Sequence, residues 1–265
     1  MNDRILSEIW RYPVKSLGGE QISAGRILPK GLEYDRRWML TDTSMQFLTQ
    51  RTVPELALFR ARIGGNDLVV QHNEHRIHVP IEARHGDLFQ ATVWADTVQV
   101  HGCSSDADTW FSDLLHRAVR LVAFPEKEAR QVDLAYSARG QWVSLADGYP
   151  FLVIGEASLA DLNARLEQPV PMNRFRPNFV FTGRHAYEED GWKKFGIGAV
   201  DFVGVKPCAR CVMITVDQAT GRKNTEPLAT LAGYRKRGGQ VYFGQNVLPC
   251  NVGTVAVGDA ILINE

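Results

Sequence analysis

The sequence of 265 residues predicts a mainly β protein of the α+β type, with a barrel-type core and a few short helices. The first hundred residues alternate apolar with polar positions and break at Gly, Asn and Asp, which is the pattern of strands joined by turns. The second half adds short runs rich in β-branched residues, which favour sheets. Only a few segments have the longer spacing of an amphipathic helix.

The first half is expected to contain strands, one hairpin and one helix. The helix is predicted over residues 104–115, because Ser104 and the aspartates after it can cap its start, while Trp110, Phe111, Leu114 and Leu115 share one apolar face. Strands are predicted over residues 5–10, 37–41, 91–94 and 119–124, and a hairpin over residues 68–79 with its turn at Asn73.

The polar stretch over residues 125–140 has few apolar anchors and is expected to hold a domain boundary. We therefore predict a β-rich N-terminal domain over residues 1–124 and a second domain with the barrel-type core over residues 125–265. In the second domain, strands are predicted over residues 150–155, 178–182, 198–205, 212–216 and 253–262, and helices over residues 156–166 and 227–235.

The composition excludes several classes of protein. Thirty Lys and Arg residues balance thirty Asp and Glu residues, so the chain lacks the basic excess of a nucleic-acid-binding protein. Its apolar runs, such as residues 151–154, are far shorter than the roughly 20 residues of a membrane span. Four cysteines are too few for a disulfide scaffold, and the first residues do not form a secretory signal, so we expect a cytoplasmic protein.

The clearest chemical feature is the pair Cys208-Ala209-Arg210-Cys211, which has several interpretations. A thioredoxin-like pair should start a helix, whereas this one precedes a β-like run. A zinc site or an iron–sulfur cluster needs four suitably spaced ligands, which the sequence does not offer around the pair. A further interpretation is that one thiolate binds a soft metal that arrives with its own organic ligand. Lys206 and Arg210 make the local field positive and would favour a thiolate, unless both are simply solvated.

Three other segments offer cations for an anionic ligand. Each places one or two basic side chains at or near a predicted strand end, where guanidinium groups could bind phosphate through paired hydrogen bonds. The segments are Tyr12-Pro13-Val14-Lys15-Ser16, Tyr34-Asp35-Arg36-Arg37-Trp38 and Arg174-Phe175-Arg176-Pro177-Asn178. Taken singly, each is more often a solvated or salt-bridged charge, so the residues alone leave the choice open.

Taken in order, these segments resemble the MOSC superfamily, named after the C-terminal domain of molybdenum cofactor sulfurase, and in particular its members with an N-terminal MOSC-type β domain. Bacterial YcbX-type proteins and the mitochondrial amidoxime reducing component are members of this kind. The resemblance covers nearly the whole chain and rests on several multi-residue motifs. Besides the segments above, it includes Glu156-Ala157-Ser158-Leu159-Ala160-Asp161-Leu162-Asn163, Phe243-Gly244-Gln245 and Val257-Gly258-Asp259.

The resemblance implies that the molybdenum cofactor (Mo-molybdopterin) binds between two β-rich regions and serves to reduce N-hydroxylated compounds. It implies that Cys211 is the catalytic molybdenum ligand and that Cys208 does not bind the metal. Residues implied to contact the cofactor are Lys15, Ser16, Arg36, Arg176 and Asn178, together with the backbone of Ala209 and Arg210.

Asp147 stands where the family has an acidic residue near the metal. It could pass a proton to the departing oxygen if burial raises its pKa, and a structural role in a turn is the alternative. The chain departs from the mitochondrial relatives at Gly148, Tyr149, Ala209 and Asn246, where those relatives have hydroxyl-bearing side chains.

Some bacterial relatives continue into a plant-type ferredoxin domain, whereas this chain ends soon after Asp259 without the cysteines for one. A separate protein is therefore expected to supply electrons: a ferredoxin, a cytochrome b5-like protein or a flavin reductase. The substrates would be small amidoximes, N-hydroxylamines or N-oxides. A different function stays open, in which Cys211 carries a persulfide or hands on the cofactor. A third possibility is a β-barrel binder of some other anion.

Overall fold

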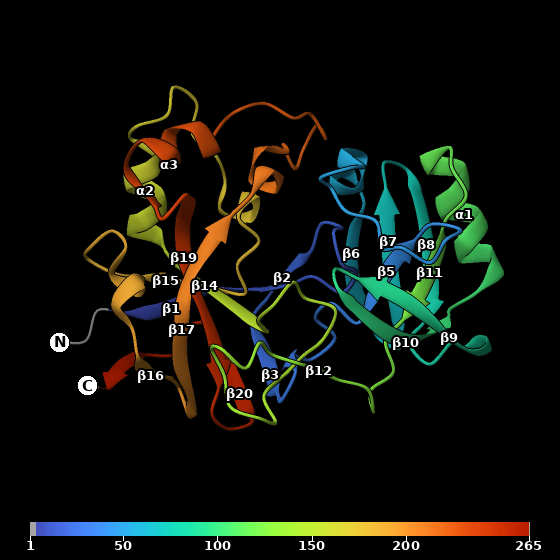
Figure 1. Cartoon of the computed structure of the whole chain (residues 1–265), viewed down its shortest axis with the longest axis horizontal. Helices are drawn as coiled ribbons and strands as arrows, with labels where there is room; N and C mark the ends of the chain where they lie inside the picture. The colour runs from blue at the N-terminus through green and yellow to red at the C-terminus, as the bar shows by residue number, and fades with distance from the viewer. Residues whose placement is uncertain (1–3, 265) are drawn as a thin grey trace.

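The computed structural model describes residues 4–264, which form two lobes built mainly of strands (Figure 1). The larger lobe, called the C-terminal lobe below, contains a nine-stranded sheet in the order β2-β1-β15-β14-β19-β17-β16-β21, with β18 paired to β19. Its strands are β1 (Ile5–Arg11), β2 (Glu20–Ile22), β14 (Phe151–Gly155), β15 (Phe179–Thr182), β16 (Lys194–Ile197), β17 (Val200–Arg210), β18 (Lys236–Arg237), β19 (Gln240–Pro249) and β21 (Ile261–Asn264).

Both faces of this sheet are buried. Alternate residues of a strand point to opposite faces, and here neighbouring residues belong to two different apolar clusters. Phe151 and Phe179 belong to one apolar cluster, whereas their neighbours Leu152 and Val180 belong to another. The second cluster also contains Leu162 of α2 (Glu156–Asn163) and Leu231 of α3 (Leu228–Tyr234), so these two short helices cover that face (Figure 1).

The expected mainly β fold is confirmed, but the path of strand pairs in the described residues does not close into a barrel. Backbone contacts nevertheless connect β1, near one end of this path, to the residues just before β21 at the other end. An isolated bridge joins Ile5 to Ala260, and the amide of Leu6 donates a hydrogen bond to the carbonyl of Asp259 at 2.9 Å. Residues near the two ends of the described part of the chain therefore lie together in the C-terminal lobe (Figure 1).

The beginning of the chain belongs in space to the C-terminal lobe. In addition to β1 and β2, the strand β3 (Ala24–Leu28) lies between β4 (Gly31–Leu32) and β20 (Gly253–Ala256) in a separate three-stranded sheet. The proposed division of the chain at residue 124 therefore does not by itself describe the lobes, because the chain starts in one lobe, crosses to the other and returns.

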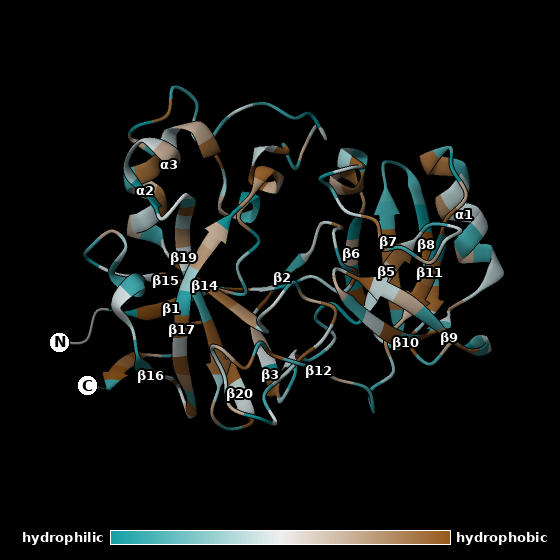
Figure 2. Ribbon diagram, in the orientation of Figure 1, coloured by the Kyte–Doolittle hydropathy of each residue, from teal (hydrophilic) through white to brown (hydrophobic). Residues whose placement is uncertain are grey.

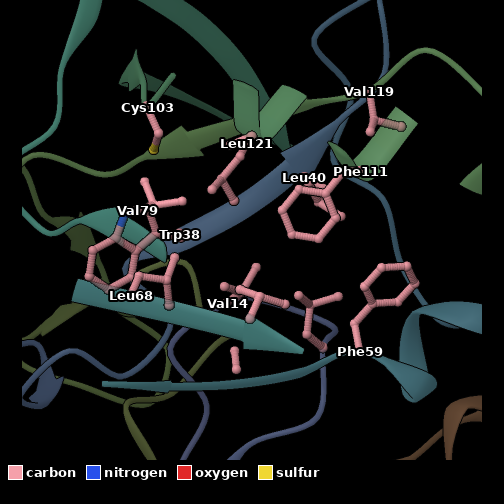
Figure 3. Packing of buried hydrophobic residues seen from close by; sticks show 14 of the residues in the cluster. Val14, Trp38, Leu40, Phe59, Leu68, Val79, Cys103, Phe111, Val119 and Leu121 are labelled. Atoms are coloured by element: carbon pink, nitrogen blue, oxygen red, sulfur yellow. The ribbon is translucent and has the colours of Figure 1, made fainter. Parts of the chain in front are cut away.

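The N-terminal lobe combines a four-stranded sheet, in the order β5-β11-β10-β9, with a three-stranded sheet, in the order β6-β7-β8. Its strands are β5 (Trp38–Thr41), β6 (Arg60–Gly64), β7 (Asp67–His72), β8 (His75–Pro80), β9 (His85–Val93), β10 (Asp96–Gly102) and β11 (Arg120–Ala123). Figure 3 shows buried side chains of β5, β7 and α1 (Ser105–Leu115) gathered in one core, among them Trp38, Leu68 and Phe111. This lobe therefore has a core of its own.

Several sequence predictions are confirmed closely in this lobe. The helix α1 begins after Ser104, whose Oγ accepts a hydrogen bond from the amide of Ala107 as an N-cap should. The hairpin of β7 and β8 turns at Asn73, which has a positive φ of 52°. Figure 2 shows hydrophobic residues concentrated on strands and hydrophilic ones on the connecting loops.

Other boundaries differ from the prediction. The strand expected over residues 212–216 is wrong, because Val212–Thr215 form the 3-10 helix η4 instead. The β-branched composition favours a strand there, but pairing of β17 with β19 ends at Arg210, and the turn that follows buries Ile214 in the cluster below α3. The helix expected to reach residue 166 ends at Asn163, and Pro227 precedes α3 rather than starting it.

The remaining elements are short. They are the 3-10 helices η1 (Pro54–Leu58), η2 (Met172–Arg174) and η3 (Glu188–Gly191), and the strand pair β12 (Arg130–Gln131) with β13 (Trp142–Val143) in the segment that joins the lobes. Within residues 4–264, no helix is both long enough and apolar enough to span a membrane.

Candidate functional site

A cavity of about 190 Å³ lies at the junction of the two lobes. It is much larger than the roughly 10–15 Å³ that one water molecule needs, so it can hold a small organic ligand. Every site residue predicted from the sequence lines it, although the residues are spread over the chain: Lys15, Ser16, Arg36, Asp147, Arg176, Asn178, Ala209, Arg210 and Cys211. The structure thus brings together the cysteine pair and the three cationic segments, whereas residues 156–163, 243–245 and 257–259 do not line the cavity.

The end of β17 positions the cysteine pair. Two irregularities interrupt its pairing with β19, one between Gly204 and Lys206 and one between Pro207 and Ala209. Such bulges bend a strand and change the direction of its side chains, and they are common beside active sites. Cys211 then caps η4 with extended backbone, so the chain turns away from the sheet at this residue.

The two cysteines have different surroundings. Cys208 accepts a hydrogen bond at Sγ from Nη1 of Arg210, at 3.2 Å, and packs beside the cluster under α3. Cys211 accepts one at Sγ from Nε of Arg51, at 3.3 Å. Arg51 comes from the segment after β5, so the N-terminal lobe provides the cation nearest to the Cys211 thiol.

One wall of the cavity consists of residues in unusual backbone conformations. Ser16, Arg36 and Arg176 all have positive φ, between 49° and 69°. Non-glycine residues adopt this region rarely and at a cost, and such strain concentrates at functional sites. Three strained residues in one wall therefore point to a function for this surface.

Hydrogen bonds hold the polar side chains of this wall in place. Arg36 donates from Nη1 to Asp35, at 2.5 Å, and to Oδ1 of Asn178, at 3.3 Å. Arg176 donates from Nη1 to the carbonyl of Leu17, at 2.6 Å. Burial and the nearby Arg36 lower the pKa of Arg176 to about 10, so Arg176 is still a cation at neutral pH. Asn178 also accepts from the amide of Leu152, at 3.3 Å, and thus links the wall to β14.

Asp147 is held by ionic contacts with two other residues that line the cavity. Its Oδ1 accepts from Lys15 at 2.5 Å and from the Trp94 indole N–H at 3.1 Å, and its Oδ2 lies 3.4 Å from Nη2 of Arg51. Lys15 and Arg51 outweigh the partial desolvation of Asp147 and hold the pKa of this carboxyl well below its usual range. Burial lowers the pKa of Lys15, and Asp147 only partly restores it.

The pKa of the Asp147 carboxyl is not raised by burial, contrary to the condition under which Asp147 would donate a proton. Asp147 was expected to donate a proton if burial raised its pKa, but half of its side chain (51%) is exposed and its cationic neighbours favour the ionised form. A carboxylate that is ionised at neutral pH carries no proton to give. Lys15, which is 5% exposed, is the protonated partner of this pair.

The charged side chains that line the cavity favour an anionic ligand. Five are cationic, those of Lys15, Arg36, Arg51, Arg176 and Arg210, and one is anionic, that of Asp147. No group of three or more His, Cys, Asp and Glu side chains that could hold a metal ion occurs among residues 4–264. A metal bound here by Cys211 would thus need most of its ligands from an organic group, and an anionic one fits the walls.

Two important residues were missed by the sequence reasoning. Arg51 follows Thr49, another lining residue, in a loop that matches none of the segments considered above. Trp94 was treated only as a strand residue, but it lies at the β9–β10 turn, where its ring is 4.4 Å from the Arg51 guanidinium. No local pattern in the sequence signals either contact, because the partners are far apart along the chain.

Comparisons with known proteins match both parts of the chain. The MOSC N-terminal beta barrel domain matches residues 4–118, and the MOSC domain matches residues 140–262. Mitochondrial amidoxime-reducing component 1 of Mus musculus is 34% identical, over 97% of this chain and 82% of its own length. Mitochondrial amidoxime reducing component 2 of Bos taurus is 35% identical, over 87% of this chain and 72% of its own.

Molybdenum cofactor sulfurase of Oryza sativa subsp. japonica is 32% identical over 92% of this chain. The match covers 32% of that relative, so the present chain spans about a third of the length of the sulfurase. The similarity to all three relatives thus extends over parts of both lobes.

Proposed function

This chain belongs to the MOSC family, and from that premise we propose that it binds the molybdenum cofactor and reduces N-hydroxylated compounds. The observation that carries the proposal is the single cavity in which the Cys211 thiol meets five cationic side chains. A thiolate suits a soft metal, and guanidinium groups suit the phosphate of a pterin ligand. The names of the mouse and bovine relatives support amidoximes as one class of substrate.

We assign the following roles to the residues of the cavity. Cys211 would bind the metal through its thiolate, while Arg36 and Arg176 would bind the phosphate, and Lys15 and Ser16 the pterin. Asn178 would keep Arg36 in place, because its Oδ1 already accepts a hydrogen bond from that side chain. The backbone of Ala209 and Arg210 would lie against the ligand, since both residues line the cavity beside Cys211.

When bound, the cofactor supplies a redox centre that gives two electrons to the N–O bond, which with two protons yields the N–H product and water. The protein orients the substrate and provides protons. Lys15 holds a proton at Nζ in this wall, and its lowered pKa makes it a better donor than an ordinary lysine. Asp147 and Arg51 fix the position of that ammonium group and of the Cys211 sulfur.

Electrons would come from a separate redox protein, for which a ferredoxin, a cytochrome b5-like protein or a flavin reductase is suitable. We propose the cytoplasm as the compartment because none of the four cysteines forms a disulfide, although two of the relatives are named mitochondrial.

Metal analysis tests the proposal directly. Protein from a host that makes molybdenum cofactor should contain about one equivalent of molybdenum, which Cys211→Ser should lose and Cys208→Ser should retain. Loaded wild-type protein should then reduce benzamidoxime repeatedly with a chemical electron donor. Absence of molybdenum from the wild-type protein, or equal loss from both variants, would contradict the assigned ligand.

The similarity to the sulfurase favours a second candidate function, in which Cys211 carries sulfur as a persulfide or hands on the cofactor. Turnover separates the two candidates. An enzyme gives many equivalents of product for each protein molecule, whereas a carrier transfers at most one equivalent of sulfur or cofactor. A protein that binds only some other anion would keep its ligand affinity in Cys211→Ser.

A further inference from the structure

Two cations of the cavity share one aromatic ring. The guanidinium carbon of Arg36 lies 4.5 Å from the centre of the Tyr12 ring, and that of Arg176 lies 4.3 Å from it. Tyr12 itself is only 1% exposed, and Trp10 stacks on it with an angle of 13° between the rings. The ring is therefore a fixed surface that two otherwise distant parts of the chain both contact.

Holding two guanidinium groups together requires compensation, because like charges repel and both side chains are largely buried. The carbonyl of Leu17 and the carboxylate of Asp35 each accept from one guanidinium. An aromatic face adds electrostatic attraction for each cation. Both guanidinium groups thus stay against the Tyr12 ring without a bound anion.

Asp35 links the ring to one of the arginines. Its Oδ1 accepts the backbone amide of Tyr12 at 2.8 Å, and its Oδ2 accepts Nη1 of Arg36 at 2.5 Å. Asp35 is 1% exposed, so water does not compete for these bonds. Ring, carboxylate and guanidinium therefore form one rigid unit.

The hydroxyl of Tyr12, unlike its ring, makes no contact within the described residues that would hold an arginine in place. Its oxygen is buried and has no hydrogen-bond partner among residues 4–264. Tyr12 also lines a smaller cavity of about 90 Å³ on the other side of the wall, where Asn173 likewise has a buried oxygen without a partner. The contacts with the arginines thus involve the aromatic face and not the hydroxyl.

We propose that Tyr12 is a positioning residue that holds Arg36 and Arg176 side by side, so that both guanidinium groups bind one phosphate group. The inference deepens the proposed function, because that phosphate would be the one of the cofactor. It predicts that the pocket binds a free phosphate group even without molybdenum. It also predicts that the ring of Tyr12 is required and that its hydroxyl is not.

The test uses cofactor-free protein titrated with inorganic phosphate and pyrophosphate, followed by calorimetry. Tyr12→Leu should weaken binding by about tenfold, because losing two cation–π contacts costs roughly 1–2 kcal/mol. The conservative variant Tyr12→Phe should bind within about threefold of wild type. Tyr34→Leu is the matched control, since Arg11 lies 6.0 Å from the Tyr34 ring but neither residue lines the cavity.

Circular dichroism and the melting temperature show whether each variant is folded, and Tyr12→Met replaces Tyr12→Leu if the latter is not. A measurement on the wild-type protein needs no variant at all. In an NMR titration, the side-chain N–H signals of Arg36 and Arg176 should shift together, with a single Kd for phosphate.

The inference would be overturned by no phosphate binding in the wild-type protein, by separate behaviour of the two arginines, or by wild-type affinity in folded Tyr12→Leu. Equal weakening in Tyr12→Phe would assign the effect to the hydroxyl and overturn it too. None of these readings depends on molybdenum. The role of Tyr12 can therefore be refuted while the metal analysis finds molybdenum, and it can be supported while the metal analysis finds none.

Discussion

Nε of Arg51 lies 3.3 Å from Sγ of Cys211, although the two residues are 160 positions apart and belong to different lobes. The guanidinium also lies over the indole ring of Trp94 and reaches Asp147. The Cys211 thiol is thus supported by the N-terminal lobe as well as by the strand that carries it. Neither lobe contains this site by itself.

We expect Arg51→Ala to lower the rate of N-hydroxylated substrate reduction by roughly tenfold to a hundredfold, because a hydrogen bond from a charged group contributes about 1.5–3 kcal/mol. Arg51→Lys should recover part of the loss, since it keeps the charge but not the planar contact with Trp94. Steady-state kinetics and molybdenum content of the same samples check this. Arg62→Ala, at an exposed arginine of β6, is the control, and a rate equal to wild type in Arg51→Ala would refute the role.

A second prediction concerns Asp147. Because Lys15 and Arg51 keep its pKa well below the usual range, its protonation should not appear in the pH dependence of the reaction between pH 5 and 8. Asp147→Asn should lower kcat/KM by roughly tenfold at pH 5, because the positions of Lys15 and Arg51 are disturbed, and by more toward pH 8, because the carboxylate that raises the pKa of Lys15 is lost. The full pH profiles of both proteins decide the matter. If the variant loses a limb of the profile near neutral pH, Asp147 is a proton donor after all.

The candidate site shows what sequence reasoning can reach. The three cationic segments and the cysteine pair could be recognised from the sequence, because each is a short motif of neighbouring residues at or near the end of a strand. The contacts of Asp147 were not readable, since Lys15 lies 132 positions away and sets the charge state of the carboxyl. Arg51 lacks a motif entirely, so only the folded structure reveals it.

The fold shows the same limit. Alternating apolar residues were sufficient to predict the mainly β class and about half of the strands, because period and burial are linked locally, but strands such as β10, β16 and β19 were not predicted. Residues 212–216 have the composition of a strand, but Val212–Thr215 form η4 and only Val216 pairs, in an isolated bridge with Lys223. Likewise, no local pattern tells that β1 pairs with β15, which lies far along the chain. Such pairings depend on the tertiary structure as a whole.

Glu189 gives the protein a pH-dependent stability that is separate from its chemistry. Its carboxyl is fully buried and accepts from Ser158 at 2.9 Å and from the amide of Gly155 at 3.2 Å. Burial raises its pKa to about 7, and the hydrogen bonds reverse only part of that shift. The folded protein therefore binds this proton more tightly than the unfolded chain, in which the pKa is near 4.5.

The stabilisation from this proton is complete below pH 4.5 and is lost as the pH rises through 7. Over that interval the free energy of unfolding should fall by up to about 3 kcal/mol on account of Glu189. Glu189→Gln stays neutral and should remove this part of the pH dependence. Urea unfolding at pH 5, 6, 7 and 8 measures it, with Glu156→Gln at an exposed position of α2 as the control. An unchanged slope in Glu189→Gln would show that the carboxyl is already ionised in the fold.

Gly244 connects the packing of β19 to the position of the cysteine pair. It has a φ of +79°, and a Cβ at this position would lie 2.7 Å from Cγ1 of Ile154. It belongs to β19 between Tyr242 and Gln245, the residues that pair with the last part of β17 across its second irregularity. Gly244→Ala should therefore both destabilise the fold and displace the strand that ends at Cys211.

A matched control separates the two costs of this substitution. Gly239 has a φ of +81° but no atom within 4 Å of its hypothetical Cβ, so Gly239→Ala meets only the backbone penalty, roughly 1–2 kcal/mol. Gly244→Ala adds the overlap with Ile154, which costs a further 1–3 kcal/mol or so. Urea unfolding should rank the variants in this order, and only Gly244→Ala should also lower the molybdenum content. Equal destabilisation of both would mean that the backbone conformation alone requires glycine in β19, and that the close approach to β14 does not shape the site.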